Sequence, residues 1–103
     1  MAVTVSFAPE ATDQLVALRR YVAAASAPEI AAQYVDSIIA YCEGLGVFPH
    51  RGTSRDDIRQ GLRVTSFRKR VMVAFVVDDS AGTLTVIGIF AGGQDYESLL
   101  GDS

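Results

Sequence analysis

The N-terminal half of the chain begins with a short stretch of alternating apolar and polar residues, and apolar residues then recur at helical spacing. Residues 3–7 alternate apolar and polar side chains, as a half-buried strand does. Pro9 suits the first turn of a helix, and one apolar stripe follows it at helical spacing: Ala11, Leu15, Leu18 and Val22. Residues 26–28 interrupt the period, and a second stripe runs up to Gly44 and Gly46: Ala31, Tyr34, Val35, Ile38, Cys42 and Leu45. The pattern predicts a strand and two helices, and the short gap predicts an antiparallel helical hairpin.

The C-terminal half has the pattern of a three-stranded antiparallel meander. Residues 47–60 form a polar stretch that predicts a surface loop. Residues 62–67 alternate, whereas 71–77 and 84–90 are apolar on both faces, as inner strands are. Residues 94–97 are expected to start a short terminal helix. The order β-α-α-β-β-β predicts an α+β fold, in which the N-terminal strand and the helical hairpin pack on a small antiparallel sheet.

Length and composition predict a single domain over residues 1–103. Half of the residues are apolar, which is enough for one core at this size. One cysteine, Cys42, cannot form an intramolecular disulfide and lies on the second helical stripe, so it is expected in the core of a cytoplasmic protein. Met1 is not followed by a signal-peptide pattern, and the longest apolar run, residues 71–77, is too short to span a bilayer. We therefore expect no membrane association.

The charge of the chain is uneven. Residues 51–70 hold seven of the nine basic residues and two of the twelve acidic ones, so this block carries +5 within a chain of net charge −3. Such asymmetry is typical of a face for an anionic partner, although solvated arginines in a loop and at strand starts give the same pattern. An acidic chain is not the usual composition of a dedicated nucleic-acid binder, so direct binding of nucleic acid stays open.

Several chemistries are excluded by motif. The chain has no glycine-rich phosphate loop and no dinucleotide fingerprint. One histidine and one cysteine cannot build a structural zinc site, and His50 lies in the polar loop, where a surface position is expected. Neither a metal nor another cofactor is therefore predicted.

Four stretches of the chain resemble the ParE branch of the RelE/ParE toxin superfamily of bacterial type II toxin–antitoxin systems. They are VSFAPEATDQLVALRRYV, AAQYVDSIIAYCEGLGVFPHRGTSRDDIRQGLR, RVMVAFVVDD and LTVIGIFAGGQDYESLL. The most specific part is the pattern P-x-x-G…D-I-R-x-G-L-R, formed by Pro49, Gly52 and residues 57–63. The resemblance implies a helical hairpin on an antiparallel sheet and a toxin that a cognate, ParD-like antitoxin neutralises.

The superfamily implies two activities. RelE-like members cleave mRNA on the ribosome with basic side chains, because the cleavage develops charge that must be neutralised. Here Arg63 matches that pattern, whereas Thr65, Met72 and Gln94 stand where further basic residues are expected. The chain is thus more similar to ParE-like members, which poison DNA gyrase and are not catalysts themselves. Two alternatives stay open: an mRNA endonuclease using Arg63, Arg70 and Tyr96, or a non-toxic relic that keeps only antitoxin binding.

The resemblance also implies two contact surfaces. For the target we predict electrostatic contact by four basic residues and specific contact by the C-terminal tail: Arg63, Arg68, Lys69 and Arg70, then Gln94, Asp95, Tyr96, Leu99 and Leu100. The antitoxin is expected to fold a flexible segment into apolar grooves between the hairpin and the sheet. Exposed apolar residues on the helices are the predicted antitoxin contacts: Val16, Ile30 and Ile39.

Overall fold

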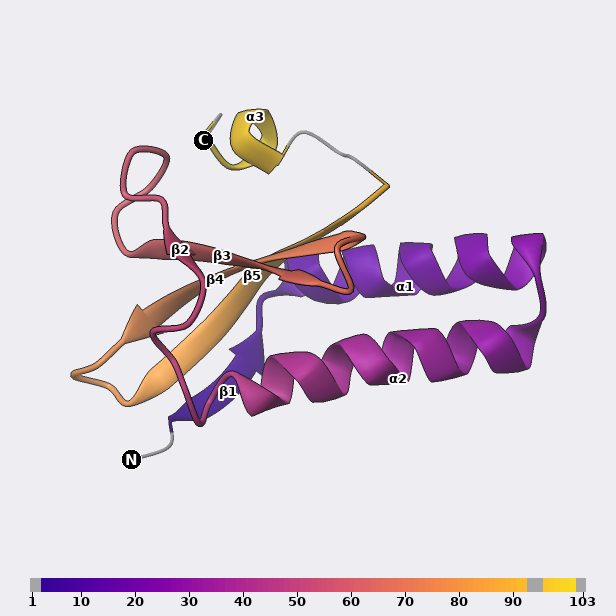
Figure 1. The fold of residues 1–103 in the computed structure, drawn as a ribbon, viewed down its shortest axis with the longest axis horizontal. Coiled ribbons are helices and arrows are strands. Elements are labelled where there is room, and N and C mark those ends of the chain that lie inside the picture. The colour runs from indigo at the N-terminus through magenta and orange to yellow at the C-terminus, as the bar shows by residue number, and fades with distance from the viewer. Residues whose placement is uncertain (1–2, 93–95, 102–103) are drawn as a thin grey trace.

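The computed structural model describes residues 3–92 and 96–101, and it confirms the predicted α+β class. Strand β1 (Thr4–Phe7) leads into the helices α1 (Pro9–Ala25) and α2 (Pro28–Gly44), which lie side by side as an antiparallel hairpin (Figure 1). Four strands follow: β2 (Thr53–Ser54), β3 (Leu62–Phe67), β4 (Val71–Asp78) and β5 (Thr83–Ala91). A short helix, α3 (Tyr96–Gly101), ends the described part of the chain. The meander strands lie within one residue of their predicted bounds.

The strands form one sheet in the order β1-β5-β4-β3-β2. Strands β2 to β5 pair antiparallel, but β1 pairs parallel with β5, with Thr4 opposite Thr83 and Phe7 opposite Val86. The sheet is therefore mixed, which corrects the prediction of an antiparallel sheet. The parallel pair is possible because the chain leaves β1 through a long connection before it returns to β5. Strands β4 and β5 contribute side chains to apolar clusters on both faces of the sheet, which explains why both are apolar on both faces.

Strand β2 was not predicted. It has two residues, Thr53 and Ser54, which pair with Val64 and Arg63 of β3. Two exposed polar residues carry no alternation that a pattern could detect. This edge strand nevertheless matters, because it fixes the middle of the polar loop against β3.

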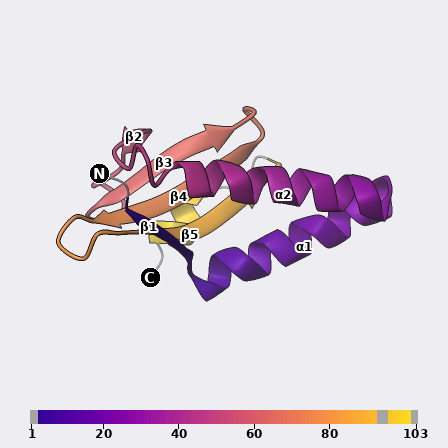
Figure 2. The same cartoon turned by 90° about the horizontal axis from the view of Figure 1, so that it is seen from below.

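The hairpin covers one face of the sheet, as the view from below shows (Figure 2). The predicted stripe of α2 is confirmed, and Ile38 and Cys42 are fully buried together with Phe75 of β4. Burial, and secondarily the charge of Glu43, raises the pKa of the Cys42 thiol to about 12, so the thiol stays neutral in the core. The opposite face carries a smaller cluster, against which Leu100 of α3 packs: Leu62, Val64, Ala74 and Phe90.

A hydrogen bond joins α1 to β5 near a bulge in the β4–β5 ladder. The register shifts between Ala74 and Phe75 of β4. Because β1 ends opposite Val86, Ile89 of β5 lies beyond it, and the Ile89 N–H donates to Gln14 Oε1 of α1 at 2.7 Å. Beside the bulge, Gly88 leaves room for the ring of Phe90, with which an added Cβ would collide. The Gln14 contact therefore joins α1 to β5 beyond the end of β1.

The outer half of the hairpin projects beyond the sheet (Figure 1). On α1 only Ala11 and Leu15 are buried, while Leu18 and Val22, further along the same stripe, are half-buried. On α2 burial begins at Ala31, and Ile30 is 54% exposed. The apolar stripe is thus longer than the sheet beneath it, and its outer part is left without cover.

Candidate interaction site

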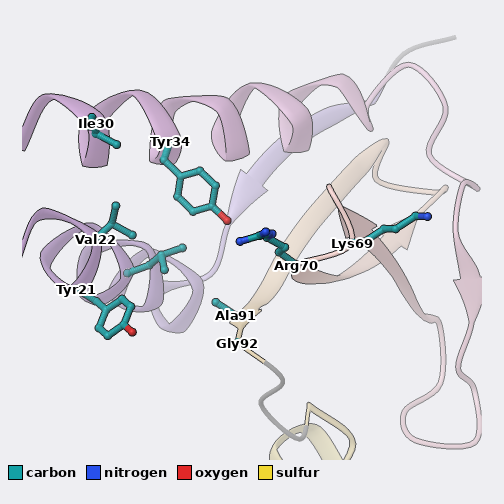
Figure 3. A pocket seen from close by; sticks show the side chains of 9 residues that line it. Tyr21, Val22, Ile30, Tyr34, Lys69, Arg70, Ala91 and Gly92 are labelled. Carbon is teal, nitrogen blue, oxygen red and sulfur yellow. The ribbon is translucent and has the colours of Figure 1, made fainter. Parts of the chain in front are cut away.

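A groove of about 610 Å³ opens where the hairpin leaves the sheet (Figure 3). Its hairpin side is apolar or aromatic, and its sheet side includes two basic residues: Leu18, Tyr21, Val22, Ile30 and Tyr34 face Lys69, Arg70, Ala91 and Gly92. A second hollow of about 390 Å³ continues along α1 past Gln14 and Ala17 to Ile89. Such an apolar hollow with basic groups on one side suits an amphipathic segment with acidic residues.

The basic side of the groove is the tight turn between β3 and β4. The ladder closes at the pair Phe67–Val71, and Arg70 N–H donates to the Phe67 carbonyl at 3.1 Å. Arg68 and Lys69 have φ angles of 52° and 60°, in the left-handed region. Hairpin turns with two such residues favour Asn-Gly, and each residue that is not glycine costs about 1–3 kcal/mol there. A strained turn built from two basic residues points to a function for their side chains.

An aromatic cluster fixes this turn against α2. The Phe67 ring packs edge-on against Tyr34 and Tyr41, with centroid distances of 6.3 Å and 5.4 Å. The Tyr41 hydroxyl also shares a hydrogen bond of 2.9 Å with the Thr65 hydroxyl. On the other side the Arg68 guanidinium lies 4.7 Å from the centroid of the Phe67 ring, as a cation–π contact. Phe67 therefore connects the basic turn rigidly to the helical hairpin.

Arg63, by contrast, is engaged within the fold. Its side chain donates to three backbone carbonyls of the polar loop: His50 at 2.6 Å, Arg51 at 3.0 Å and Gly52 at 3.2 Å. Gly52 itself has a φ of 86°, and a Cβ there would collide with the Val64 carbonyl oxygen. This part of the sequence motif thus shapes the loop, and target contact by Arg63 stays a prediction.

Replacing Arg63 by methionine is expected to lower the free energy of unfolding by about 1–3 kcal/mol, because three carbonyls lose a charged donor. Arg59→Met is the matched control: Arg59 is exposed in the same loop, and less than about 0.5 kcal/mol is expected there. Urea unfolding of both variants measures the difference. Equal stability of the two variants would show that the Arg63 contacts do not hold the loop.

Two acidic residues of the polar loop also stabilise its shape. Asp56 accepts hydrogen bonds from the Gly61 N–H at 2.8 Å and the Ser54 hydroxyl at 2.9 Å, and these contacts lower the pKa of its carboxyl group. Asp57 accepts from Arg55 Nε and Nη2 at 2.9 Å and 2.8 Å, and this hydrogen bonding lowers its pKa too. The same Arg55 donates to Glu97 of α3 at 2.6 Å. The loop and the terminal helix are therefore joined through one guanidinium.

The predicted tail contacts are only partly within the described residues. Leu99 is 58% exposed, whereas Leu100 is half-buried against the sheet face opposite the hairpin. Gln94 and Asp95 lie outside the described residues, as does the side chain of Tyr96. Target contact by this tail stays a prediction.

Of the three predicted antitoxin contacts, one lines the groove. Ile30 lies in it, while Val16 is 44% exposed on another part of α1. Ile39 was expected to be exposed, but it is half-buried against the main core, which corrects that expectation. Sequence reasoning assigned Tyr34 to packing alone, and the groove shows that this side chain also faces a hollow. One feature of the sequence could have indicated this groove: the apolar stripes of the two helices are longer than a small sheet can cover.

Residues 3–92 and 96–101 carry no features of a metal site or a membrane span. No group of three or more histidine, cysteine or acidic side chains that could hold a metal ion lies within those ranges. Among the helices described there, none has the length and apolarity needed to cross a membrane. His50 is exposed in the polar loop, as predicted, and its Nε2 lies 3.3 Å from Asp79.

Comparison with solved structures identifies the class of fold. The chain is similar to one from the chromosomal ParDE toxin–antitoxin system of P. aeruginosa, with a TM-score of 0.75 and 18% identity over 87% of this chain and 96% of that one. It is also similar to a chain of the RelBE2 toxin–antitoxin complex of Mycobacterium tuberculosis, with a TM-score of 0.65 and 16% identity over 91% and 95% of the two chains. At these identities the likeness establishes a RelE/ParE-like fold.

The family follows from the sequence. Residues 5–96 match the family described as the ParE toxin of the type II toxin–antitoxin system parDE. The chain therefore belongs to the ParE toxin family. No curated protein matches the sequence of this chain.

Proposed function

We propose that this protein is a toxin that poisons DNA gyrase in the cytoplasm through the basic β3–β4 turn, and that a cognate antitoxin neutralises it. The observation that carries the proposal is the strained turn itself, in which Arg68 and Lys69 adopt left-handed conformations that disfavour such side chains. Together with Arg70 they place three positive charges at one end of the sheet. Among the described residues, none of these three side chains forms an ion pair. The cations of the ion pairs found there are His50 and Arg55.

The geometry gives less support to an mRNA endonuclease. Arg63 is opposite Phe75, four ladder pairs from the turn that holds Arg70, a separation of roughly 13 Å at the rise of a strand. The Arg63 guanidinium is also occupied by three loop carbonyls. General acid–base chemistry needs groups that converge on one reacting atom, which these two arginines do not do. Binding to a macromolecular target is the function that the described residues support better.

The antitoxin is proposed to occupy the groove between the hairpin and the turn. The uncovered stripe of Leu18, Val22 and Ile30 offers apolar contacts, and Arg70 belongs to both the groove and the basic turn. A segment bound there would lie over part of the surface proposed for the target. Neutralisation then results from covering the basic turn, and no change of the fold is required.

Purified gyrase tests the proposal directly. With the protein added, a supercoiling and cleavage assay is expected to yield trapped, linearised DNA. Arg68→Glu should reduce trapping by about tenfold, because it reverses a charge at the target surface without altering the groove. Arg20→Glu, the same change at an exposed position of α1, is the matched control and should trap DNA normally.

Two results would contradict the gyrase proposal. Ribosome-dependent mRNA cuts without trapped DNA would establish the endonuclease alternative. A folded protein that binds the antitoxin but affects neither gyrase nor translation would be a non-toxic relic.

A further inference from the structure

Arg70 and Tyr34 extend toward each other within the groove, from the β3–β4 turn and from α2 (Figure 3). Both side chains end in hydrogen-bond donors: a guanidinium, which only donates, and a phenol O–H. In the part of the chain that the structure describes, neither side chain has a hydrogen bond or an ion pair with a protein acceptor. Two converging donors without an acceptor define a place where an acceptor can bind.

The surroundings favour an anionic acceptor. Among the residues that the structure describes, no acidic residue lines this groove, while Lys69 adds a second positive charge beside Arg70. Most of the remaining lining is apolar, from Leu18, Val22 and Ile30, so a charge bound here is less screened than on an open surface. The edge contact of the Tyr34 ring with Phe67 fixes the position of its hydroxyl.

We infer that Arg70 and Tyr34 form a carboxylate-binding subsite for the antitoxin, which takes one Asp or Glu side chain of the segment in the groove. This inference rests on the proposed antitoxin function of the same groove. A carboxylate has two oxygens, so one can accept from the guanidinium fork while the other accepts from the phenol. Apolar side chains of the same segment lie on Leu18, Val22 and Ile30. The subsite adds a requirement for an acidic residue at one position of the antitoxin.

Affinity measurements with the antitoxin encoded beside this chain test the subsite. Arg70→Met should weaken binding by about 30-fold or more, since it removes the charge and keeps most of the apolar stem. Tyr34→Phe should weaken it by about 3–10-fold, because only the hydroxyl is lost and the ring still packs on Phe67. The matched control is Arg20→Met, which changes an exposed arginine on α1 that does not line the groove. This control should bind within about twofold of the unchanged protein.

Double-mutant cycles then locate the carboxylate. Each Asp and Glu of the antitoxin is changed to its amide and combined with Arg70→Met. One amide variant is expected to lose affinity with the unchanged toxin and to lose almost nothing further with Arg70→Met. If Arg70→Met binds like Arg20→Met, or if the cycles show no coupled position, the subsite does not exist. Failure of the unchanged protein to bind the antitoxin would instead overturn the proposed function on which the subsite rests.

Discussion

Replacing Ile30 by glutamate is expected to weaken binding of the antitoxin by about 30-fold or more, which corresponds to about 2 kcal/mol. Ile30 lies in the groove with 54% of its surface exposed, so a partner that fills the groove must cover it. A carboxylate at this position would lose its hydration when the antitoxin covers the apolar part of the groove. Because the side chain contributes little to the core, the fold should remain intact, and circular dichroism and urea unfolding can verify this.

Val16→Glu is the control for the Ile30 prediction. It introduces the same charge at an apolar helical residue of similar exposure, 44%, that does not line the groove. Isothermal titration of both variants with the antitoxin should separate them clearly. Equal loss in both variants would show that the antitoxin covers Val16 as well as the groove, and no loss in either would exclude the groove.

Replacing Phe75 by alanine is expected to lower the free energy of unfolding by about 3–5 kcal/mol. Phe75 is the largest of the fully buried side chains and packs in the cluster between the sheet and the hairpin. Removing its ring leaves a cavity that a packed core fills only in part. A domain of this size has about 5–15 kcal/mol of stability, so a large share of it would be lost.

Phe48→Ala makes the same chemical change at the surface. Phe48 is 61% exposed, and its recorded ring contact is with Arg51, whose guanidinium carbon lies 5.5 Å from the ring centroid. A loss below about 1 kcal/mol is expected, since an exposed cation–π contact contributes little. Urea unfolding followed by circular dichroism measures both variants. A similar loss in both would mean that burial does not set the cost of losing the ring at position 75.

The predicted target surface and the predicted antitoxin surface, which were separate in the sequence, share a groove in the structure. Arg70 was predicted to contact the target and Ile30 to contact the antitoxin, and both line one groove. Their proximity follows from the packing of Phe67 against Tyr34, which places the β3–β4 turn beside α2. If both proposed contacts are correct, the antitoxin and the target compete for the same end of the molecule. The carboxylate subsite would make that competition dependent on charge.

One basic residue of the sequence motif, Arg63, is engaged within the fold. Arg63 was predicted to contact the target, yet its guanidinium holds the carbonyls of His50, Arg51 and Gly52. A cluster of arginines in a sequence cannot show which of them are occupied, because the acceptors here are backbone atoms with no sequence signature. Only the fold shows that the Arg63 side chain is occupied by loop carbonyls, whereas residues 68–70 form a turn at the end of the sheet.

The sequence by itself determined the main helices and strands and the class of fold, although not the two-residue strand β2. The helical period of Ala31, Val35, Ile38 and Cys42 and the apolar runs of β4 and β5 are local patterns, because each follows from which face of an element is buried. The tertiary structure alone decided the parallel pairing of β1 with β5, the bulge at Ala74 and Phe75, and the meeting of Arg70 with Tyr34. These features join residues far apart in the chain. A local pattern of apolar residues predicts that a side chain is buried, but it does not predict which distant residue covers that side chain.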